Sequence, residues 1–259
     1  MTLISVRDLR VRIGERVIAD VPELDVARGE CVAVVGESGS GKSTTLLSIL
    51  GLVEGAQISG SIEAFGVDVR TASRSRLREI RGAKIALVMQ SPQAALNPTL
   101  RLGTLLRRAL KRHGVAGAEA ERRTAQAVAD VMLEPAILRR YPHEVSGGQA
   151  QRFALALALA LGAEVILADE PTSALDVTVQ AEVVAVLRRL RAERGLAVLL
   201  VSHDLALVSI VADRVLVMRE GRVVESGPAA EVFARPRDPY TRELIAAVPV
   251  LPEADRVHD

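Results

Sequence analysis

The segment GESGSGKS, residues 36–43, constrains the fold of this chain more than any other feature of the sequence. It follows the β-branched run CVAVV, precedes a run with helical spacing, TTLLSILGLV, and fits the pattern G-x-x-x-x-G-K-[ST]. Between a strand and a helix, such glycines let backbone N–H groups turn inward around phosphate oxygens, and the positive end of the helix attracts the anion further. The sequence therefore predicts a nucleotide-phosphate site within an α/β fold.

The residues of this loop have separate expected roles. Lys42 should reach the β- and γ-phosphates, the Ser43 hydroxyl should ligate Mg²⁺, and Thr44 should add a phosphate contact. A glycine-rich turn that binds no ligand is the alternative interpretation. The candidate nucleotide-binding residues of the loop are Gly36, Glu37, Ser38, Gly39, Ser40, Gly41, Lys42, Ser43 and Thr44.

A second apolar run, EVILADE (residues 164–170), ends abruptly in two carboxylates. We expect a buried strand that delivers Asp169 to the metal, through a water molecule, and Glu170 to the attacking water, which it orients or deprotonates. By itself an apolar run that ends in Asp-Glu would be unremarkable, because many strands end in solvated acids. Because a phosphate loop precedes it in the chain, we interpret Asp169 and Glu170 as functional residues.

Two further polar residues, Gln90 and His203, end the apolar runs KIALVMQ and LLVSH. Taken singly, each is more simply explained as structural. If their strands run parallel to the strand of Asp169, the carboxyl ends gather at one edge of the sheet, and both side chains approach the γ-phosphate. They are candidate catalytic residues only as members of this set.

The order of the elements predicts the architecture. Residues 3–13 and 16–26 alternate apolar and polar side chains as strands do, with breaks at Gly14 and around Pro22. Residues 91–143 carry apolar side chains at three- and four-residue spacing, which is typical of amphipathic helices, and strands alternate with helices after them. We expect an α/β fold with a mainly parallel sheet, an antiparallel N-terminal β subdomain and an inserted α-helical subdomain.

Composition excludes several classes of protein. The net charge of +1 argues against a broad nucleic-acid footprint, so we expect no nucleic-acid partner. The single cysteine, Cys31, excludes an internal disulfide. Charged residues interrupt any signal peptide, and the apolar run at 153–161 is far shorter than the ~20 residues of a membrane helix. We expect a cytosolic protein that works at a membrane only through a partner.

The segment VSGGQAQR, residues 145–152, is a second candidate anion site, because it opens a helix with a serine and two glycines. An intramolecular glycine cap is the alternative. Together with the segments above and SALD (residues 173–176), it resembles the ATP-binding cassette (ABC) family over essentially the whole chain. GESGSGKS is similar to the Walker A motif, EVILADE to Walker B, VSGGQ to the signature, SALD to the D-loop, Gln90 to the Q-loop glutamine and His203 to the switch histidine.

The resemblance implies a P-loop NTPase core of the RecA-like type in a single ABC ATPase domain, residues 1–259. It implies an α/β core of residues 1–90 and 160–235, a helical subdomain with the signature at 91–159, and a C-terminal tail at 236–259. It also implies ATP and Mg²⁺ as cofactors. The residues expected at the metal are Ser43, Gln90 and Asp169.

In this family two cassettes pack head to tail, so that each signature faces the Walker A loop of the other. The resemblance therefore implies that ATP held by a second ABC ATPase subunit, the same chain or a paralogue, contacts Ser146, Gly147, Gly148 and Gln149. The family also stacks adenine on an aromatic residue near the position of Ile13. An aliphatic side chain there lacks the ~0.5–1.5 kcal/mol that ring stacking adds beyond burial.

Finer features are similar to the importer subfamily for peptides and nickel, namely the segments MQSPQAALNP, SALDVTVQA and DPYTRELIAAVP. The subfamily implies ATP hydrolysis coupled to transmembrane transport of a peptide, nickel or a metallophore. It also implies permease subunits docked on residues 91–110 and, indirectly, a solute-binding protein. The expected location is peripheral, at the cytoplasmic face of the plasma (inner) membrane. The alternative is an ABC ATPase of a non-transport complex, of the DNA-repair or the carbon–phosphorus lyase type.

Overall fold

The computed structural model of the chain describes residues 1–247, and the end of the expected tail, residues 248–259, lies outside the described residues. The strands are β1 (Thr2–Ile13), β2 (Arg16–Ala27), β3 (Cys31–Val35), β4 (Gln57–Ala64), β5 (Val67–Asp68), β6 (Ile85–Val88), β7 (Val165–Asp169), β8 (Ala197–Ser202), β9 (Arg214–Arg219) and β10 (Arg222–Pro228). The helices are α1 (Lys42–Ile49), α2 (Arg74–Ile80), α3 (Pro92–Ala95), α4 (Leu102–Arg112), α5 (Gly117–Asp130), α6 (Gly147–Leu161), α7 (Val177–Arg194), α8 (Leu205–Val211), α9 (Ala229–Ala234) and α10 (Pro239–Ala246). Two short 3₁₀ helices, η1 (Pro135–Arg139) and η2 (Pro142–Glu144), precede α6.

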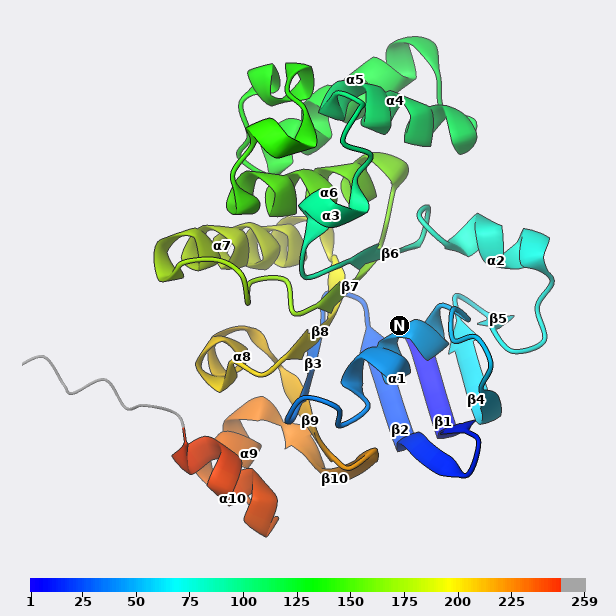
Figure 1. Ribbon diagram of the computed structural model, residues 1–259, viewed down its shortest axis with the longest axis vertical. Coiled ribbons are helices and arrows are strands. Elements are labelled where there is room, and N and C mark those ends of the chain that lie inside the picture. The colour runs from blue at the N-terminus through cyan, green and yellow to red at the C-terminus, as the bar shows by residue number, and fades with distance from the viewer. Residues whose placement is uncertain (248–259) are drawn as a thin grey trace, which may run out of the picture.

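All of these strands belong to one sheet, in the order β5-β4-β1-β2-β10-β9-β3-β8-β7-β6. Strands β9, β3, β8, β7 and β6 pair in parallel, whereas β1 pairs antiparallel with β2 and β4. The antiparallel strands stand apart from the helices α3–α7, which lie at the other end of the molecule (Figure 1). This mixed α/β architecture is the fold class that the sequence predicts.

Strand β3 shows why the parallel part of the sheet is covered on both faces. All five of its residues are buried. Cys31, Ala33 and Val35 belong to a core shared with α4–α7, whereas Val32 and Val34 belong to a core shared with β1, β2 and α1. Because successive side chains of a strand point to opposite faces, one short apolar run supplies both layers.

The N-terminal hairpin differs from the expectation at one point. Gly14 lies in the turn between β1 and β2 with a φ of 59°, as predicted, but β2 continues through Pro22, so the break expected there is wrong. Proline lacks an N–H, which a strand tolerates where one side carries no ladder. Strand β2 pairs with β10 only where Asp20 lies opposite Arg222. The side of β2 that faces β10 therefore needs no N–H donor near Pro22.

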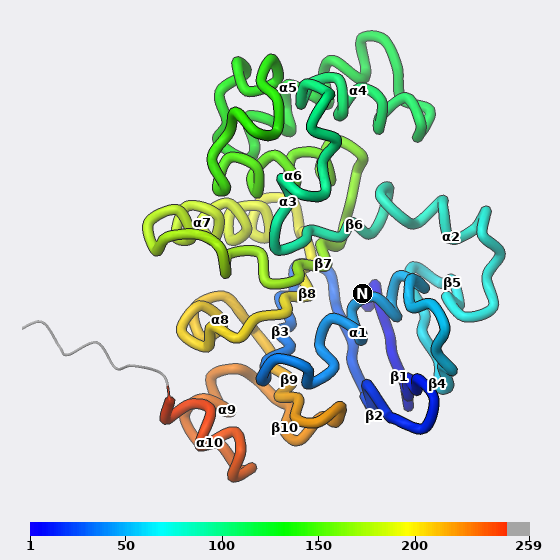
Figure 2. Tube along the Cα trace, in the orientation of Figure 1, coloured from blue at the N-terminus to red at the C-terminus, as the bar shows by residue number. Residues whose placement is uncertain are grey.

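Between β6 and β7 the chain makes an excursion through α3–α6 that contains no strand (Figure 2). Leu102, Leu106 and Leu110 of α4 recur every four residues and are fully buried, as in an amphipathic helix that packs on a core. At the opposite end of the molecule, α9 and α10 lie beside β10 (Figure 1). The excursion and the C-terminal helices therefore flank the carboxyl ends of the parallel strands.

Candidate functional site

The carboxyl ends of four neighbouring parallel strands meet at one edge of the sheet. The loop 36–43 follows β3, Gln90 follows β6, Glu170 follows β7 and His203 follows β8, each by one or two residues. The strands are in register, so these positions lie at about the same level. The register pairs at this edge are Val35–Ser202, Val201–Asp169 and Ala168–Val88.

Two glycines of the loop are required by close approaches of the backbone. A Cβ on Gly41 would lie 2.3 Å from the carbonyl oxygen of Ile18, and a Cβ on Gly36 would lie 2.1 Å from that of Met218. The φ of Gly41, 100°, also favours glycine. Gly41 is the N-cap of α1 and leaves the first turn without a side-chain cap, so the N–H groups of that turn are available to an anion.

Lys42 is held inside this loop. Its side chain is 6% exposed, and its ammonium donates hydrogen bonds of 2.7 Å to the carbonyl oxygens of Gly36 and of Glu37. Burial lowers the pKa of Lys42, against the attraction of Glu170, Asp169 and Glu37. Because an ammonium has three donors, one remains for a phosphate oxygen.

Ser43 and Asp169 meet across the site, where the serine hydroxyl donates to Oδ1 of Asp169 at 2.9 Å. Burial raises the pKa of Asp169, with a smaller contribution from the charge of Glu170, while the Ser43 hydrogen bond and Lys42 lower it. Mg²⁺ is usually held by one or two carboxylates together with substrate phosphates, and these two oxygen donors fit that pattern. Within residues 1–247 no group of three or more His, Cys, Asp or Glu side chains would hold a metal.

Glu170 and His203 are in direct contact, with 3.1 Å between Oε1 of the carboxylate and Nδ1 of the imidazole. Glu170 has a φ of 48°, a left-handed conformation that costs a non-glycine residue ~1–3 kcal/mol. Its N–H donates to the carbonyl oxygen of Val201 at 2.9 Å, which fixes this strained residue to β8. The neighbouring strands therefore aim an acid and an imidazole at the same point.

Two of the predicted site residues are less closely tied to this centre. Strand β6 ends at Val88, so Gln90 lies two residues beyond it and is exposed. Ile13 ends β1 and is 50% exposed. No hydrogen bond of the described chain joins either residue to the loop 36–44. Their roles at the metal and the adenine stay predictions.

The segment 145–149 begins α6 and lies apart from the phosphate loop of its own chain: β6 and β7 lie between α6 and α1 (Figure 1). The Ser146 hydroxyl accepts the N–H of Gln149 at 3.2 Å, and Oε1 of Gln149 accepts the N–H of Ser146 at 3.1 Å. This reciprocal cap fixes the start of α6. Among residues 1–247 no acceptor is recorded for the N–H groups of Gly147 and Gly148.

The two signature glycines also lie against their own chain. A Cβ on Gly148 would lie 2.1 Å from Cγ1 of Val179, and a Cβ on Gly147 would lie 3.0 Å from Cδ2 of Leu175. Gly148 is buried, whereas Gly147 and Ser146 are exposed. Intramolecular packing therefore explains why residue 148 is glycine, and the exposed N–H end of the helix is a separate feature.

Two residues near the site were missed by sequence reasoning. The Tyr240 hydroxyl accepts the N–H of Glu37 in the phosphate loop at 3.0 Å. The Gln93 amide donates to the carbonyl oxygen of Val145 at 2.6 Å and so joins the segment after Gln90 to the start of the signature. Both lie in the segments DPYT and MQSPQ, so the resemblance marked the stretches but not the contacts.

Comparison with known proteins agrees with this arrangement. Residues 20–173 match the family described as ABC transporter. The chain is 44% identical, over 249 residues, to a putative peptide import ATP-binding protein of Brucella abortus (strain 2308), a match that covers 94% of this chain and 75% of that protein. A putative peptide import ATP-binding protein of Brucella ovis is 44% identical over 253 residues, covering 95% of this chain and 78% of its own length.

Solved structures show the same fold. The cbiO1 protein of Clostridium perfringens, part of the ABC transporter complex cbiONQ, superposes with a TM-score of 0.80 at 27% identity, covering 90% of this chain and 91% of that one. The dimeric structure of the bacterial ABC transporter cassette MJ0796 gives a TM-score of 0.76 at 29% identity, covering 87% and 98%.

The fold and the site define a P-loop nucleoside triphosphatase. The chain belongs to the ABC transporter family, and it is an ATPase of that family.

The raised pKa of Asp169 predicts that Asp169→Asn stabilises the nucleotide-free protein at neutral pH. The folded state holds the Asp169 proton more tightly than the unfolded chain, whose carboxyl has a pKa near 3.8, so this contribution to stability is lost as the pH rises through the raised pKa. The advantage of the variant should be greatest at neutral pH and disappear below pH ~4. Urea unfolding at several pH values measures it.

The control for this prediction is Asp25→Asn, because a hydrogen bond from Arg7 lowers the pKa of Asp25. That variant should lose stability at neutral pH and approach the wild type in acid. Equal losses in both variants would contradict the assignment of a desolvation cost to Asp169.

The Gly148 contact predicts a compensating pair. Gly148→Ala should destabilise the protein by ~1–3 kcal/mol, because the new Cβ overlaps Val179. Adding Val179→Ala removes the overlapping methyl groups and should restore part of the loss, which a double-mutant cycle by chemical denaturation measures. Gly147→Ala is the control: its Cβ meets Leu175, so Val179→Ala should not rescue it. Additive effects of Gly148→Ala and Val179→Ala would refute the contact.

Proposed function

We propose that this chain is the nucleotide-binding subunit that powers an ABC importer for peptides, nickel or a metallophore. The observation that carries the proposal is the contact of Glu170 with His203 at the same sheet edge as the Ser43–Asp169 pair. The names of the relatives support the peptide class of substrate. They do not favour the alternative, an ABC ATPase of a DNA-repair or carbon–phosphorus lyase complex.

The phosphates of ATP lie, on this proposal, against residues 36–44. Lys42 donates its remaining N–H to a phosphate oxygen, and Thr44 adds a further contact. Ser43 and Asp169, with Gln90, would hold Mg²⁺, which would neutralise phosphate charge. Ile13 provides an aliphatic contact for adenine.

Glu170 orients and deprotonates the attacking water. Nδ1 of His203 lies 3.1 Å from Oε1 of Glu170, which leaves Oε2 for the water. Gln90, two residues beyond the end of β6, would approach the γ-phosphate from the neighbouring strand end. Because both partners follow buried strands, the geometry exists before the substrate arrives.

Completion of the site by a second cassette is part of the proposal. The exposed Ser146 and the free N–H groups of Gly147 and Gly148 suit an anion from outside the chain. Gln149 supports this end of the helix through its reciprocal bonds with Ser146. The cassette MJ0796, which resembles this chain, is dimeric with ADP and Pi. The partner is the same chain or a paralogue.

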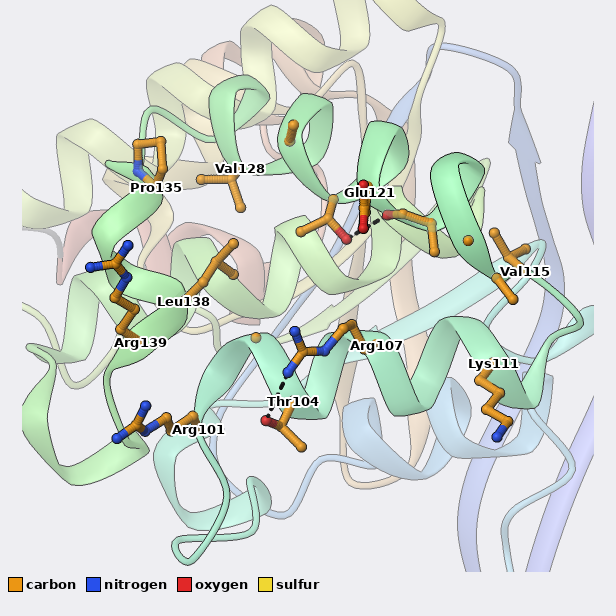
Figure 3. A pocket seen from close by; sticks show the side chains of 16 residues that line it. Arg101, Thr104, Arg107, Lys111, Val115, Glu121, Val128, Pro135, Leu138 and Arg139 are labelled. Carbon is orange, nitrogen blue, oxygen red and sulfur yellow. Dashed lines mark hydrogen bonds between the residues drawn. The ribbon is translucent and has the colours of Figure 1, made fainter.

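The permease docks, we infer, on the helical end of the molecule. A cavity of about 680 Å³ lies between α4, α5 and η1, with Val128 and Leu138 among its apolar walls (Figure 3). Four cationic side chains also line it: Arg101, Arg107, Lys111 and Arg139. The first two belong to the predicted docking segment, residues 91–110, so an acidic segment with apolar anchors fits best.

The remaining assignments follow from this picture. Residues 1–90 and 160–235 would form the core, 91–159 the helical subdomain and 236–259 the tail, which the run of helices α3–α6 between β6 and β7 supports. Among the described residues, no helix combines the length and the apolar character that a membrane span needs. The subunit would sit peripherally on the cytoplasmic face of the plasma membrane through the permease, which receives its cargo from a solute-binding protein.

The catalytic role of Glu170 predicts that Glu170→Gln leaves ATP binding intact, lowers turnover at least ~100-fold and traps a closed dimer. Glutamine keeps the shape of the side chain beside His203, but it takes no proton. ATPase assays, equilibrium binding and gel filtration with ATP measure the three effects. Glu164→Gln is the control, since Glu164 lies just before the other end of β7. Hydrolysis that persists in Glu170→Gln removes Glu170 from the role of base.

The role of Ser146 in the partner's site predicts that Ser146→Phe impairs hydrolysis while the isolated monomer binds nucleotide almost normally. Ser146→Ala is the control, because it loses the helix cap, worth ~0.5–2 kcal/mol, without adding bulk. The alanine variant should retain more activity than the phenylalanine variant. Collapse of nucleotide binding in the monomer would show that Ser146 acts on its own chain.

Transport itself is tested by co-purification of the tagged chain with membrane subunits. Retention of a permease, and its loss when Arg101 and Arg107 are changed to glutamate, would support the importer and the docking surface. A soluble complex without membrane subunits would favour the non-transport alternative.

A further inference from the structure

The C-terminal segment DPYT is fixed to the sheet by backbone hydrogen bonds. The carboxylate of Glu225, in β10, accepts the N–H of Arg237 at 2.9 Å and the N–H of Asp238 at 3.1 Å. Asp238 in turn caps α10, since its Oδ1 accepts the N–H of Tyr240 at 2.8 Å. The position of Tyr240 is therefore set by β10 and not by α10 alone.

Tyr240 is buried where α10 meets the end of the sheet. Its side chain is 3% exposed and belongs to the core shared with α4–α7. The guanidinium of Arg219, at the end of β9, lies 4.8 Å from the ring centroid on its face. Burial raises the pKa of Tyr240, so its hydroxyl is neutral at physiological pH. A buried tyrosine hydroxyl usually has a partner, and here the partner is the N–H of Glu37.

The backbone of Glu37 makes several of the hydrogen bonds that hold the phosphate loop. Its N–H donates to Tyr240 at 3.0 Å, and its carbonyl oxygen accepts the Lys42 ammonium at 2.7 Å and the N–H of Ser40 at 3.2 Å. The peptide groups on both sides of one residue are thus held, one by the C-terminal helix and the other by the lysine that serves the phosphates. Gly221, in the turn after β9, adds a bond from its N–H to the carbonyl oxygen of Ser40 at 3.2 Å.

We propose that Tyr240 is a positioning residue for nucleotide: its hydroxyl fixes the Glu37 peptide and so holds the phosphate loop in the form that receives the β- and γ-phosphates. The proposed function assigns no other role to the DPYT segment. The Tyr240–Glu37 hydrogen bond joins residues that are 203 positions apart in the chain. The inference rests on the proposed function, because it needs residues 36–43 to bind ATP. Tyr240 acts through Glu37 and touches no substrate.

The test is Tyr240→Phe, which keeps the ring, the packing and the contact with Arg219 but removes the acceptor of the Glu37 N–H. The affinity for ADP should fall and the KM for ATP should rise, each about two- to tenfold, which is the factor expected for one neutral hydrogen bond. The kcat at saturating ATP should stay within twofold, because Glu170 and His203 are unchanged. Equilibrium ADP binding and steady-state kinetics on the full chain measure this split.

Two variants serve as controls. Tyr141→Phe changes the only other tyrosine of the chain, in the 3₁₀ segment before the signature, and should leave ADP affinity unchanged. Asp238→Ala removes the cap that places Tyr240, so it should weaken ADP binding alone but add little in the Tyr240→Phe background. This lack of additivity separates positioning of the loop from two independent losses of stability.

The outcomes are distinct. Unchanged ADP affinity and KM in Tyr240→Phe, with or without a lower melting temperature, would overturn the proposal and leave Tyr240 as a packing residue. A fall in kcat with unchanged KM would overturn it as well. If the wild-type chain itself binds neither ADP nor ATP, the proposed function fails, and that result is seen before any variant is compared.

Discussion

The common register of the parallel strands is the constraint on which the site depends. Side chains alternate along a strand, so a slip of one residue in β7 would turn Asp169 away from Ser43 and move Glu170 from His203. Strand β7 is paired on both sides, with β8 and β6, and its first four residues are buried. The burial that stabilises the sheet therefore also aims the carboxylates.

Burial and charge oppose each other at this edge. Desolvation lowers the pKa of Lys42 and raises that of Asp169, so each ionised group is held at a cost that the opposite charge only partly offsets. Bound phosphate oxygens would give the Lys42 ammonium a charged hydrogen-bond acceptor. A bound divalent cation would give the Asp169 carboxylate a positive charge to ligate. The left-handed conformation of Glu170 adds backbone strain at the same edge.

Local sequence predicted the features that local chemistry determines. The strand–loop–helix around Lys42 and the apolar run before Asp169 were recognised because short patterns specify them. Strand β4 was missed, because Gly60 stands at one of the few apolar positions of its short alternating pattern. Pro22 was taken as a break because a sequence does not show that one side of β2 lacks a partner.

The contacts that join distant segments lay beyond any local pattern. The Tyr240–Glu37 bond and the Gly148–Val179 approach depend on how the C-terminal helix and α7 pack, which spacing does not reveal. For the same reason the two signature glycines were expected first of all to serve an external anion, with an intramolecular cap as the alternative. In the structure one of them is also needed by its own chain.

That second requirement connects the two ends of the molecule. Residues 170–179 run from Glu170 to the start of α7. The Ser173 hydroxyl donates to the carbonyl oxygen of Glu170 at 3.1 Å, while Leu175 and Val179 touch the glycines that open α6. On the proposed dimer, Glu170 acts on this chain's ATP and the start of α6 acts on the partner's. A short, packed segment thus connects Glu170 to the start of α6.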